Sequence, residues 1–198
     1  MATPPATPLP PLTDRRVVPI ALTAIAIVAA LVTLRMMGRI GWCALGDINP
    51  ISLDAWGPHN SQHFADPYVF SHFLHGVVFF FLFHFGVLRR KPMWGLLAAM
   101  LLEIAWEIFE NTPFTINRYR VATAAVGYTG DSVANSLGDM LACLGGWFVA
   151  RYVGIRWSIV LYLVLEIGCA IWIRDNLTLN VIQFIHPIQS IKTWQSGA

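Results

Sequence analysis

Three glutamates at helical spacing form the pattern in this sequence that most clearly indicates chemistry. Glu103, Glu107 and Glu110 lie at positions i, i+4 and i+7, which places them on one face of a helix. Like charges at this spacing repel each other. In a poorly hydrated environment they cannot all ionise unless a cation, an arginine or a shared proton compensates. The pattern therefore predicts a group that binds a positive charge or holds a proton.

Two other polar helix faces accompany the glutamates. His72 and His75 share a face at i, i+3, and Asp131, Asn135 and Asp139 follow one another at four-residue steps. These residues lie in or beside apolar runs, where a charge at mid-bilayer costs at least ~2.5–3.5 kcal/mol. We therefore expect these faces to point toward protein or water and to lie close together.

The three faces allow two interpretations, a functional pocket or a buried ion-pair network that fixes helix register. In a pocket, Glu107, Asp139 and His75 are the candidate catalytic residues, acting as acid, base or metal ligand. Arg118 and Arg120, which follow the glutamate face in the sequence and precede Asp131, would hold an anionic group such as a phosphate. The candidate substrate-binding residues are Arg118, Arg120, Asn135, Asp131 and Glu110.

Histidine and carboxylate side chains in this combination also suit a divalent metal. Imidazole nitrogen and carboxylate oxygen are ligands for zinc, manganese or iron, and His72-x-x-His75 can bind a metal from one helix. The candidate ligands are His72, His75, Glu103 and Glu107. The sequence lacks the metalloprotease signature and the residue order of a hydrolase triad. The identity of any cofactor therefore stays open.

The elements that must position these residues are membrane-spanning helices. The chain has 198 residues, 56% of them hydrophobic and 12% charged, which is typical of a domain in lipid. Each of five apolar runs is long enough to cross a bilayer. We therefore expect an all-α fold, a polytopic bundle of about five transmembrane helices that forms one domain over residues 17–198. The expected spans are residues 17–34, 68–88, 93–109, 133–150 and 157–173.

Basic residues orient this bundle. The connection Arg89-Arg90-Lys91 and the segment from Arg151 to Arg156 carry five positive charges and no acid, so the positive-inside rule places both in the cytoplasm. Arg15 and Arg16 then also lie inside. Five crossings put the C-terminus on the opposite, periplasmic side. The histidine and carboxylate faces are expected toward that outer side.

Both ends of the chain have distinct patterns. Residues 1–16 are rich in proline and predict a disordered cytoplasmic segment. Residues 177–195 have helical amphipathic spacing, which indicates an interfacial helix that Pro187 breaks or bends. Glu166, alone in the last apolar run, could join the pocket or reach the membrane surface through helix tilt.

Charge and cysteine content exclude other classes. A net charge of +2 without a basic stripe excludes a nucleic-acid partner, so membrane lipids are the expected partners. Protein partners cannot be named. Cys43, Cys143 and Cys169 are odd in number and far apart, which indicates small core residues and not a disulfide framework or a paired-cysteine metal site.

Several short motifs resemble an uncharacterised family of bacterial multi-pass inner-membrane proteins of the UPF class. The resemblance covers about residues 40–195 and implies a location more than an activity. The order of a His-Gly helix, a glutamate-rich helix and a Gly-Asp helix is also distantly similar to the VanZ-like families. The motifs include Asn60-Ser61-Gln62-His63, Ser71-His72-x-x-His75-Gly76, Glu103-x-x-Trp106-Glu107-x-x-Glu110-Asn111, Asn117-Arg118-Tyr119-Arg120 and Gly130-Asp131-Ser132-x-x-Asn135-Ser136-x-x-Asp139.

These patterns leave three hypotheses for function. The first is an outward-facing polar pocket within the membrane that binds, and could modify, a lipid or envelope headgroup or a cation. The second is a structural or assembly subunit whose polar residues form buried ion pairs. Proton or ion passage is disfavoured, because the polar residues cluster toward one side of the membrane. Whether the protein is an enzyme stays open.

Overall fold

The computed structural model describes residues 17–86 and 88–197, and within them it contains seven helices and no strand. The all-α fold class is therefore confirmed. The predicted disordered segment, residues 1–16, lies outside the described residues. The helices are α1 (Val17–Met36), α2 (Val69–His84), α3 (Pro92–Glu110), α4 (Pro113–Ala122), α5 (Val133–Ile173), α6 (Leu177–Ile185) and α7 (Gln189–Gln195).

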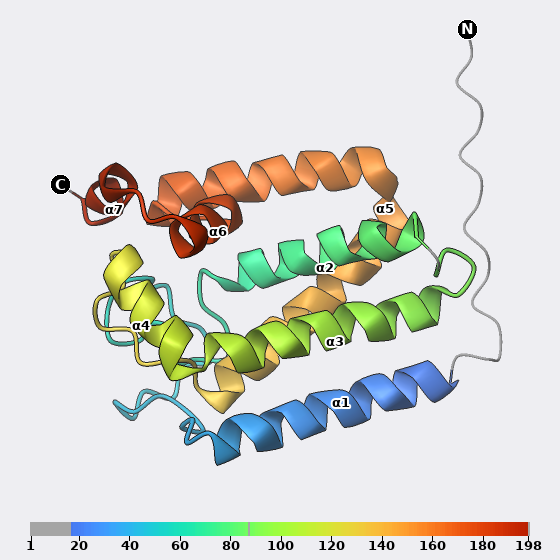
Figure 1. The fold of residues 1–198 in the computed structure, drawn as a ribbon, viewed down its shortest axis with the longest axis horizontal. Coiled ribbons are helices and arrows are strands. Elements are labelled where there is room, and N and C mark those ends of the chain that lie inside the picture. Colours follow the sequence, from blue (N-terminus) through green and yellow to red (C-terminus); the bar gives the residue numbers. More distant parts are fainter. Residues whose placement is uncertain (1–16, 87, 198) are drawn as a thin grey trace, which may run out of the picture.

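Three of the helices are long and apolar enough to cross a membrane, namely α1, α3 and α5, and α2 is a shorter apolar helix. The 41 residues of α5 include one non-helical position, Gly154, with φ 75° and ψ 175°. The chain reverses there, so that α5 consists of two legs (Figure 1). The expected spans at 133–150 and 157–173 coincide with these legs. Each of the five apolar runs contains a helix, although α2 covers only Val69–His84 of the span expected at 68–88, and the number of membrane crossings stays a prediction.

The bundle is held together most extensively by α2 and α5, and their close approach depends on glycine. A Cβ atom on Gly76 would collide with the Cys143 carbonyl, and one on Gly146 would collide with the Phe73 carbonyl. Small residues at such crossings are typical of helices that pack in membranes. Cys143 lies in the buried core beside them, and Cys169 is also buried, as the sequence indicated.

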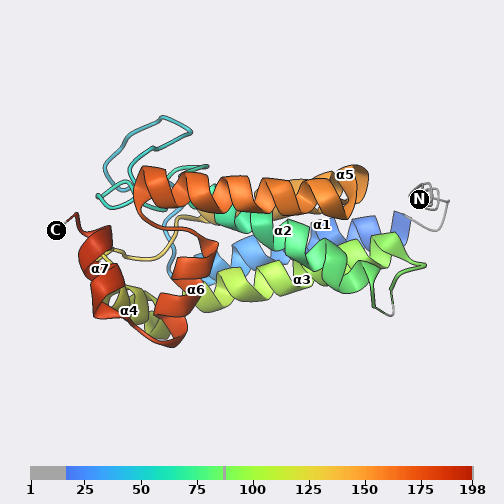
Figure 2. The same ribbon diagram turned by 90° about the horizontal axis from the view of Figure 1, so that it is seen from above.

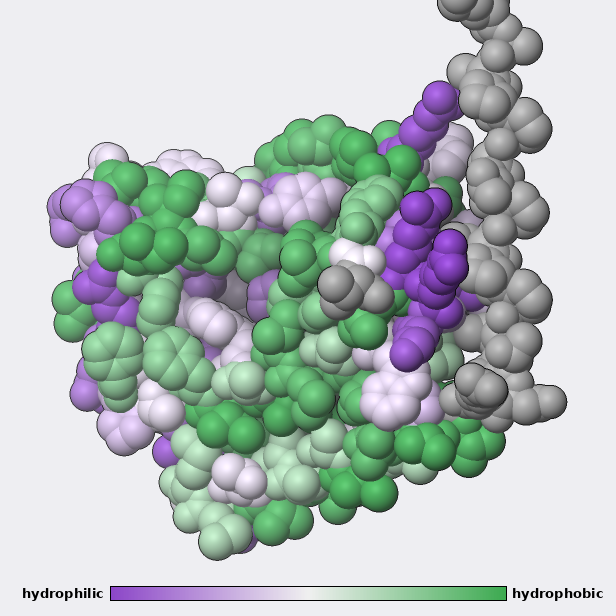
Figure 3. All heavy atoms as spheres, turned by 45° about the vertical axis from the view of Figure 1, so that its right-hand side comes forward, coloured by the Kyte–Doolittle hydropathy of each residue, from purple (hydrophilic) through white to green (hydrophobic). Residues whose placement is uncertain are grey.

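Polar connecting segments gather at one end of the bundle. The loop between α1 and α2 lies there with α4, α6 and α7, and Figure 2 shows the same grouping from above (Figures 1 and 2). The opposite end carries the connection between α2 and α3, the kink of α5 and the start of α1. Hydrophobic surface dominates the middle of the face in Figure 3, and hydrophilic surface concentrates toward the two ends and in a hollow.

The tail forms two short helices instead of one. α6 ends at Ile185 and α7 begins at Gln189, so the break expected at Pro187 is present. Gln183 of α6 is fully buried, and its amide donates to the Ala122 carbonyl at 2.7 Å. α6 therefore packs on α4 as part of the protein. Its placement at a membrane interface stays a prediction.

Glu166 has a role that neither alternative from the sequence included. Its two carboxylate oxygens accept hydrogen bonds from the backbone N–H groups of Leu177 (2.9 Å) and Thr178 (3.1 Å). Asn176 adds a side-chain cap by accepting from the Leu179 N–H group at 2.8 Å. A carboxylate at this position satisfies free N–H groups and complements the helix dipole. Glu166 thus fixes the start of α6 and does not line the cavity described below.

Candidate functional site

Helices α2 and α3 bring the predicted histidines and glutamates together. The Nδ1 atom of His72 lies 2.6 Å from Oε1 of Glu103, and Nδ1 of His75 lies 2.9 Å from Oε2 of the same carboxylate. Both oxygens of Glu103 thus face histidines, and because Glu103 is fully buried, neither oxygen faces solvent. Such a carboxylate fixes the orientation of both rings, which leaves each Nε2 atom available for another partner.

Helix α5 and the next turn of α3 add two more buried carboxylates to this cluster. Oε1 of Glu107 lies 3.2 Å from Nδ1 of His72, and Oδ2 of Asp139 lies 4.0 Å from its Nε2. Among the described residues, no hydrogen-bond partner is present for either oxygen of Glu107 or for Oδ1 of Asp139. Buried oxygens without partners are costly, which indicates that a ligand or proton completes the cluster.

Two sets of side chains in this cluster have the spacing of metal ligands. One is His72, His75 and Glu103, and the other is His72, Glu107 and Asp139, with the ligand atoms of each set within 4.8 Å of one another. In the first set both oxygens of Glu103 already form hydrogen bonds with the two histidines. The second set has the unpartnered oxygens, so it fits a cation better. Three of the four predicted ligands fall in the first set, and Glu107 falls in the second.

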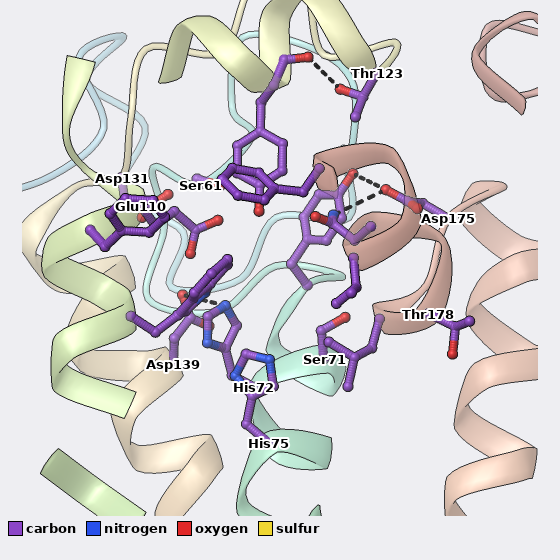
Figure 4. A pocket seen from close by; sticks show the side chains of 18 of the residues that line it. Ser61, Ser71, His72, His75, Glu110, Thr123, Asp131, Asp139, Asp175 and Thr178 are labelled. Atoms are coloured by element: carbon purple, nitrogen blue, oxygen red, sulfur yellow. Dashed lines mark hydrogen bonds and ion pairs between the residues drawn. The ribbon is translucent and has the colours of Figure 1, made fainter. Parts of the chain in front are cut away.

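A large cavity opens beside the cluster. Its volume is about 840 Å³, which is within the range of small-molecule sites. Figure 4 shows His72 and Asp139 facing each other across its floor, with Glu110 and Asp131 to one side and Asp175 to the other. The walls are apolar and come from α2, α3 and α6. The wall residues include Val78, Phe79, Leu102, Trp106, Phe109, Val181, Ile182, Phe184 and Ile185.

Carboxylates outside the apolar helices extend the polar part of the cavity. Burial raises the pKa of Asp175 to about 7, and the Tyr68 hydroxyl donates to its Oδ2 atom at 3.2 Å. Burial likewise raises the pKa of Asp131, although hydrogen bonds from the Tyr128 hydroxyl (2.8 Å) and the Asn111 amide (2.7 Å) oppose that shift. These groups therefore hold protons more readily than exposed carboxylates do.

Three of the predicted substrate-binding residues lie outside the cavity. The guanidinium group of Arg118 donates to the carbonyls of Phe184 and Ile185, at 2.8 and 3.0 Å, and that of Arg120 donates to the Tyr128 carbonyl at 2.5 Å. Asn135 donates to the His63 carbonyl at 2.9 Å. All three hold backbone segments in place. Of the five residues in this prediction, the structure brings only Asp131 and Glu110 to the cavity.

Sequence reasoning also missed cavity residues. Tyr68 and Asp175 belong to turns that bound α2 and α5, and they meet only because the second leg of α5 returns to the end where α2 begins. Tyr119 and Tyr128 line the cavity from α4 and the loop after it. A pair such as Asp175-Asn176 at the end of an apolar run indicates a polar cap at a helix end. It gave no indication of its partner.

The described residues thus form an all-helical protein with three helices that are long and apolar enough to cross a membrane, and with a buried cluster of histidine and carboxylate side chains. The chain belongs to the family described as protein of unknown function DUF2585, whose model matches residues 34–197. This confirms the resemblance to an uncharacterised family, while the likeness to VanZ-like families stays a prediction.

Curated relatives carry the name UPF0314 protein and come from bacteria. The chain is 43% identical to one from Rhizobium johnstonii over 82% of this chain and 83% of that protein. It is 42% identical to one from Rhizobium meliloti, with 82% of each chain covered. A relative from Sphingopyxis alaskensis is 41% identical over 89% of this chain and 94% of that protein. No solved structure matches the chain.

Proposed function

We propose that this protein binds a membrane lipid in the cavity and holds the polar headgroup of that lipid against a divalent cation at His72, Glu107 and Asp139. The observation that carries the proposal is the joint presence of apolar walls and a floor of buried, unpartnered carboxylate oxygens. A wholly apolar ligand would leave these oxygens without partners. An inorganic ion alone would leave the apolar walls without contacts.

The charges of the cluster support a cation. Glu103, Glu107 and Asp139 are buried around His72, and His75 is the second imidazole. Two imidazoles cannot neutralise three carboxylates, so a cation or additional protons must compensate in this poorly hydrated setting. The ligand types suit zinc, manganese or iron. Arg118 and Arg120 donate to backbone carbonyls away from the cavity, which leaves the cation as the group that would attract an anionic headgroup.

The position of the cation also suits chemistry on the headgroup. A divalent cation polarises a bound oxygen, and Glu107 or His75 could then accept or donate a proton. Asp139 would act as a ligand from α5. Binding is the proposed function, and turnover would be an additional property of the same residues.

We infer further that the protein is a multi-pass protein of the bacterial inner membrane, with the cytoplasmic N-terminus and periplasmic C-terminus expected from the sequence. The basic connection between α2 and α3 and the kink of α5 lie at the same end of the bundle as the start of α1, which supports this orientation. The cavity then belongs to the outer, periplasmic half.

Substitution of one cation ligand tests the proposal. Wild-type protein, Glu107→Gln and a control, Asp54→Asn, are purified in mild detergent and analysed for metal by mass spectrometry and for retained lipid by native mass spectrometry. We expect Glu107→Gln to lose one equivalent of divalent cation and to retain less than about a tenth of the lipid. Asp54 lies in the loop between α1 and α2 and not in the cavity, so its variant should behave as wild type.

The structural alternative gives a different result. If the cluster is only an ion-pair network, wild-type protein carries no cation at this site, and a chelator leaves lipid retention unchanged. Glu107→Gln would then lower the melting temperature without any change in metal or lipid content. That combination would contradict the proposed function.

A further inference from the structure

Four potential metal ligands meet in the loop between α1 and α2, away from the histidines of the cavity. They are Cys43, Asp47, His59 and His63. Cys43 and His63 are buried, with 6% and 0% of their surface exposed, while Asp47 and His59 are about one-third exposed. Cys43 is buried, as the sequence indicated, and its thiol lies beside the imidazoles of His59 and His63.

The distances between the ligand atoms fit one tetrahedral ion. Zinc bonds of ~2.0–2.3 Å place neighbouring ligand atoms roughly 3.3–3.8 Å apart. The Sγ atom of Cys43 lies 3.6 Å from Nδ1 of His59, and that nitrogen lies 3.0 Å from Nε2 of His63. Oδ2 of Asp47 lies 4.0 and 3.9 Å from the same two nitrogens. The ligand atoms of Cys43, His59 and His63 all lie within 4.8 Å of one another, and Asp47 would move closer to them as the fourth ligand.

Hydrogen bonding can pair the two imidazoles, but it does not include the Asp47 carboxylate, whose Oδ2 atom lies 4.0 and 3.9 Å from the two ring nitrogens. The Nδ1 atom of His63 faces the Asn49 carbonyl at 2.5 Å and must donate to it, because a carbonyl only accepts. In a neutral ring its Nε2 atom therefore carries a lone pair. One proton on Nδ1 of His59 can satisfy that lone pair at 3.0 Å, and it is then not available to the Cys43 sulfur at 3.6 Å or to the Asp47 carboxylate oxygen at 4.0 Å. A single cation would satisfy all of them at once.

Neighbouring groups hold the ligands in position, as outer-shell partners do in metal sites. Oδ1 of Asp47 accepts from both the backbone and side-chain amides of Asn49, at 3.0 and 2.8 Å, which leaves Oδ2 facing the imidazoles. The Trp42 indole donates to the Asp47 carbonyl at 2.6 Å, and its ring meets His63 edge-on. The Asn49 carbonyl fixes the tautomer of His63.

We propose that Cys43, Asp47, His59 and His63 form a structural zinc site. One thiolate, two imidazoles and one carboxylate match the ligand preferences and the closed four-coordinate geometry of structural zinc. The proposal does not depend on the function of the cavity, since the two clusters share no residue.

The zinc would fix the loop that closes one wall of the cavity. Asn60 and Ser61 line the cavity, and they belong to the same segment as His59 and His63. On its other side this segment is bound to the start of α5, where the Ser132 hydroxyl donates to the Gln62 carbonyl at 3.1 Å. Zinc would connect this anchored segment to Cys43 and Asp47, and so hold the whole loop in one conformation.

Cobalt substitution tests this site separately from the cavity. Full-length protein is stripped of metal and titrated with Co²⁺, and we expect a thiolate-to-cobalt charge-transfer band whose final intensity corresponds to one thiolate-bound Co²⁺ per chain and which disappears when Zn²⁺ is added. Cys43→Ser should abolish the band. Cys143→Ser, which removes a core thiol, should retain it, and so should Glu107→Gln, because the cavity cluster has no sulfur ligand. A missing band in wild-type protein, or a band that survives in Cys43→Ser, would overturn the proposal.

A measurement on wild-type protein covers the case in which Cys43→Ser does not fold. X-ray absorption at the zinc edge should show one sulfur at ~2.3 Å with nitrogen or oxygen at ~2.0–2.1 Å. Zinc bound without any sulfur neighbour, or no bound zinc after equilibration with Zn²⁺, would exclude the site. Loss of metal from the cavity would leave this sulfur signal unchanged, so failure of either proposal can be recognised without the other.

Discussion

Asp175 is the residue whose protonation the structure defines most clearly outside the apolar helices. Its side chain is 1% exposed, and it accepts hydrogen bonds from the Tyr68 hydroxyl and the Asn176 N–H group. Burial raises its pKa to about 7, far above the ordinary value of ~3.9. The folded protein therefore holds a proton that the unfolded chain releases at lower pH.

This difference predicts a pH dependence of stability. Between about pH 4 and about pH 7 the folded state binds more protons than the unfolded state, so the free energy of unfolding falls as pH rises, and above about pH 7 the contribution of Asp175 levels off. Asp175→Asn removes the ionisation and should flatten this fall. Melting temperatures in detergent across that range measure it. If the melting temperature of the variant falls with pH as steeply as that of the wild-type protein, Asp175 is not responsible for the pH dependence.

The residues that the sequence revealed are those whose partners follow from helical spacing. Glu103 and Glu107 interrupt an apolar run with a spacing of four residues, and His72 and His75 interrupt another with a spacing of three, so each face could be recognised in isolation. Asp175 could not be connected to Tyr68 in this way. That contact depends on a chain reversal 21 residues earlier, at Gly154, where no local pattern specifies the partner.

Helix α5 is the element whose length and kink carry the prediction of two membrane crossings. Its 41 residues are far more than the ~20 that one crossing needs, and Gly154 divides them with a positive φ that other residues rarely adopt. The sequence indicated a connection here from the positive charges of Arg151 and Arg156. It did not show that the connection would be a single turn. We therefore expect each leg to cross the membrane once.

Cysteine labelling tests the two crossings of α5. Arg156→Cys places a thiol at the kink, and Ser190→Cys places one in α7, and both positions are exposed. An impermeant maleimide added to cells with a permeabilised outer membrane should label Ser190→Cys only, because the legs place the two sites on opposite sides. Wild-type protein is the control, since its three cysteines are buried. Equal labelling of both variants before lysis would contradict two crossings.

At the scale of the whole molecule, apolar segments form the bundle and polar segments close one of its ends. The helical class and the apolar runs could be predicted because the bilayer requires long helices whose backbone groups are satisfied internally. The folding of the polar end could not be predicted. The guanidinium group of Arg118 holds the end of α6 and does not line the cavity, and the buried Cys43 meets His59 and His63 within one loop, and no local pattern specifies either contact.

The central claim is that the cavity accommodates a lipid, and filling the cavity tests it most directly. Ala105 of α3 lines the cavity, so Ala105→Trp should exclude the ligand, while Ala24→Trp on the exposed face of α1 adds the same bulk elsewhere. Native mass spectrometry of the three proteins, purified from the same membranes, counts the lipid molecules retained. We predict one tightly bound lipid in wild-type protein and in Ala24→Trp, and none in Ala105→Trp. Equal lipid retention by Ala105→Trp and wild-type protein would contradict the account.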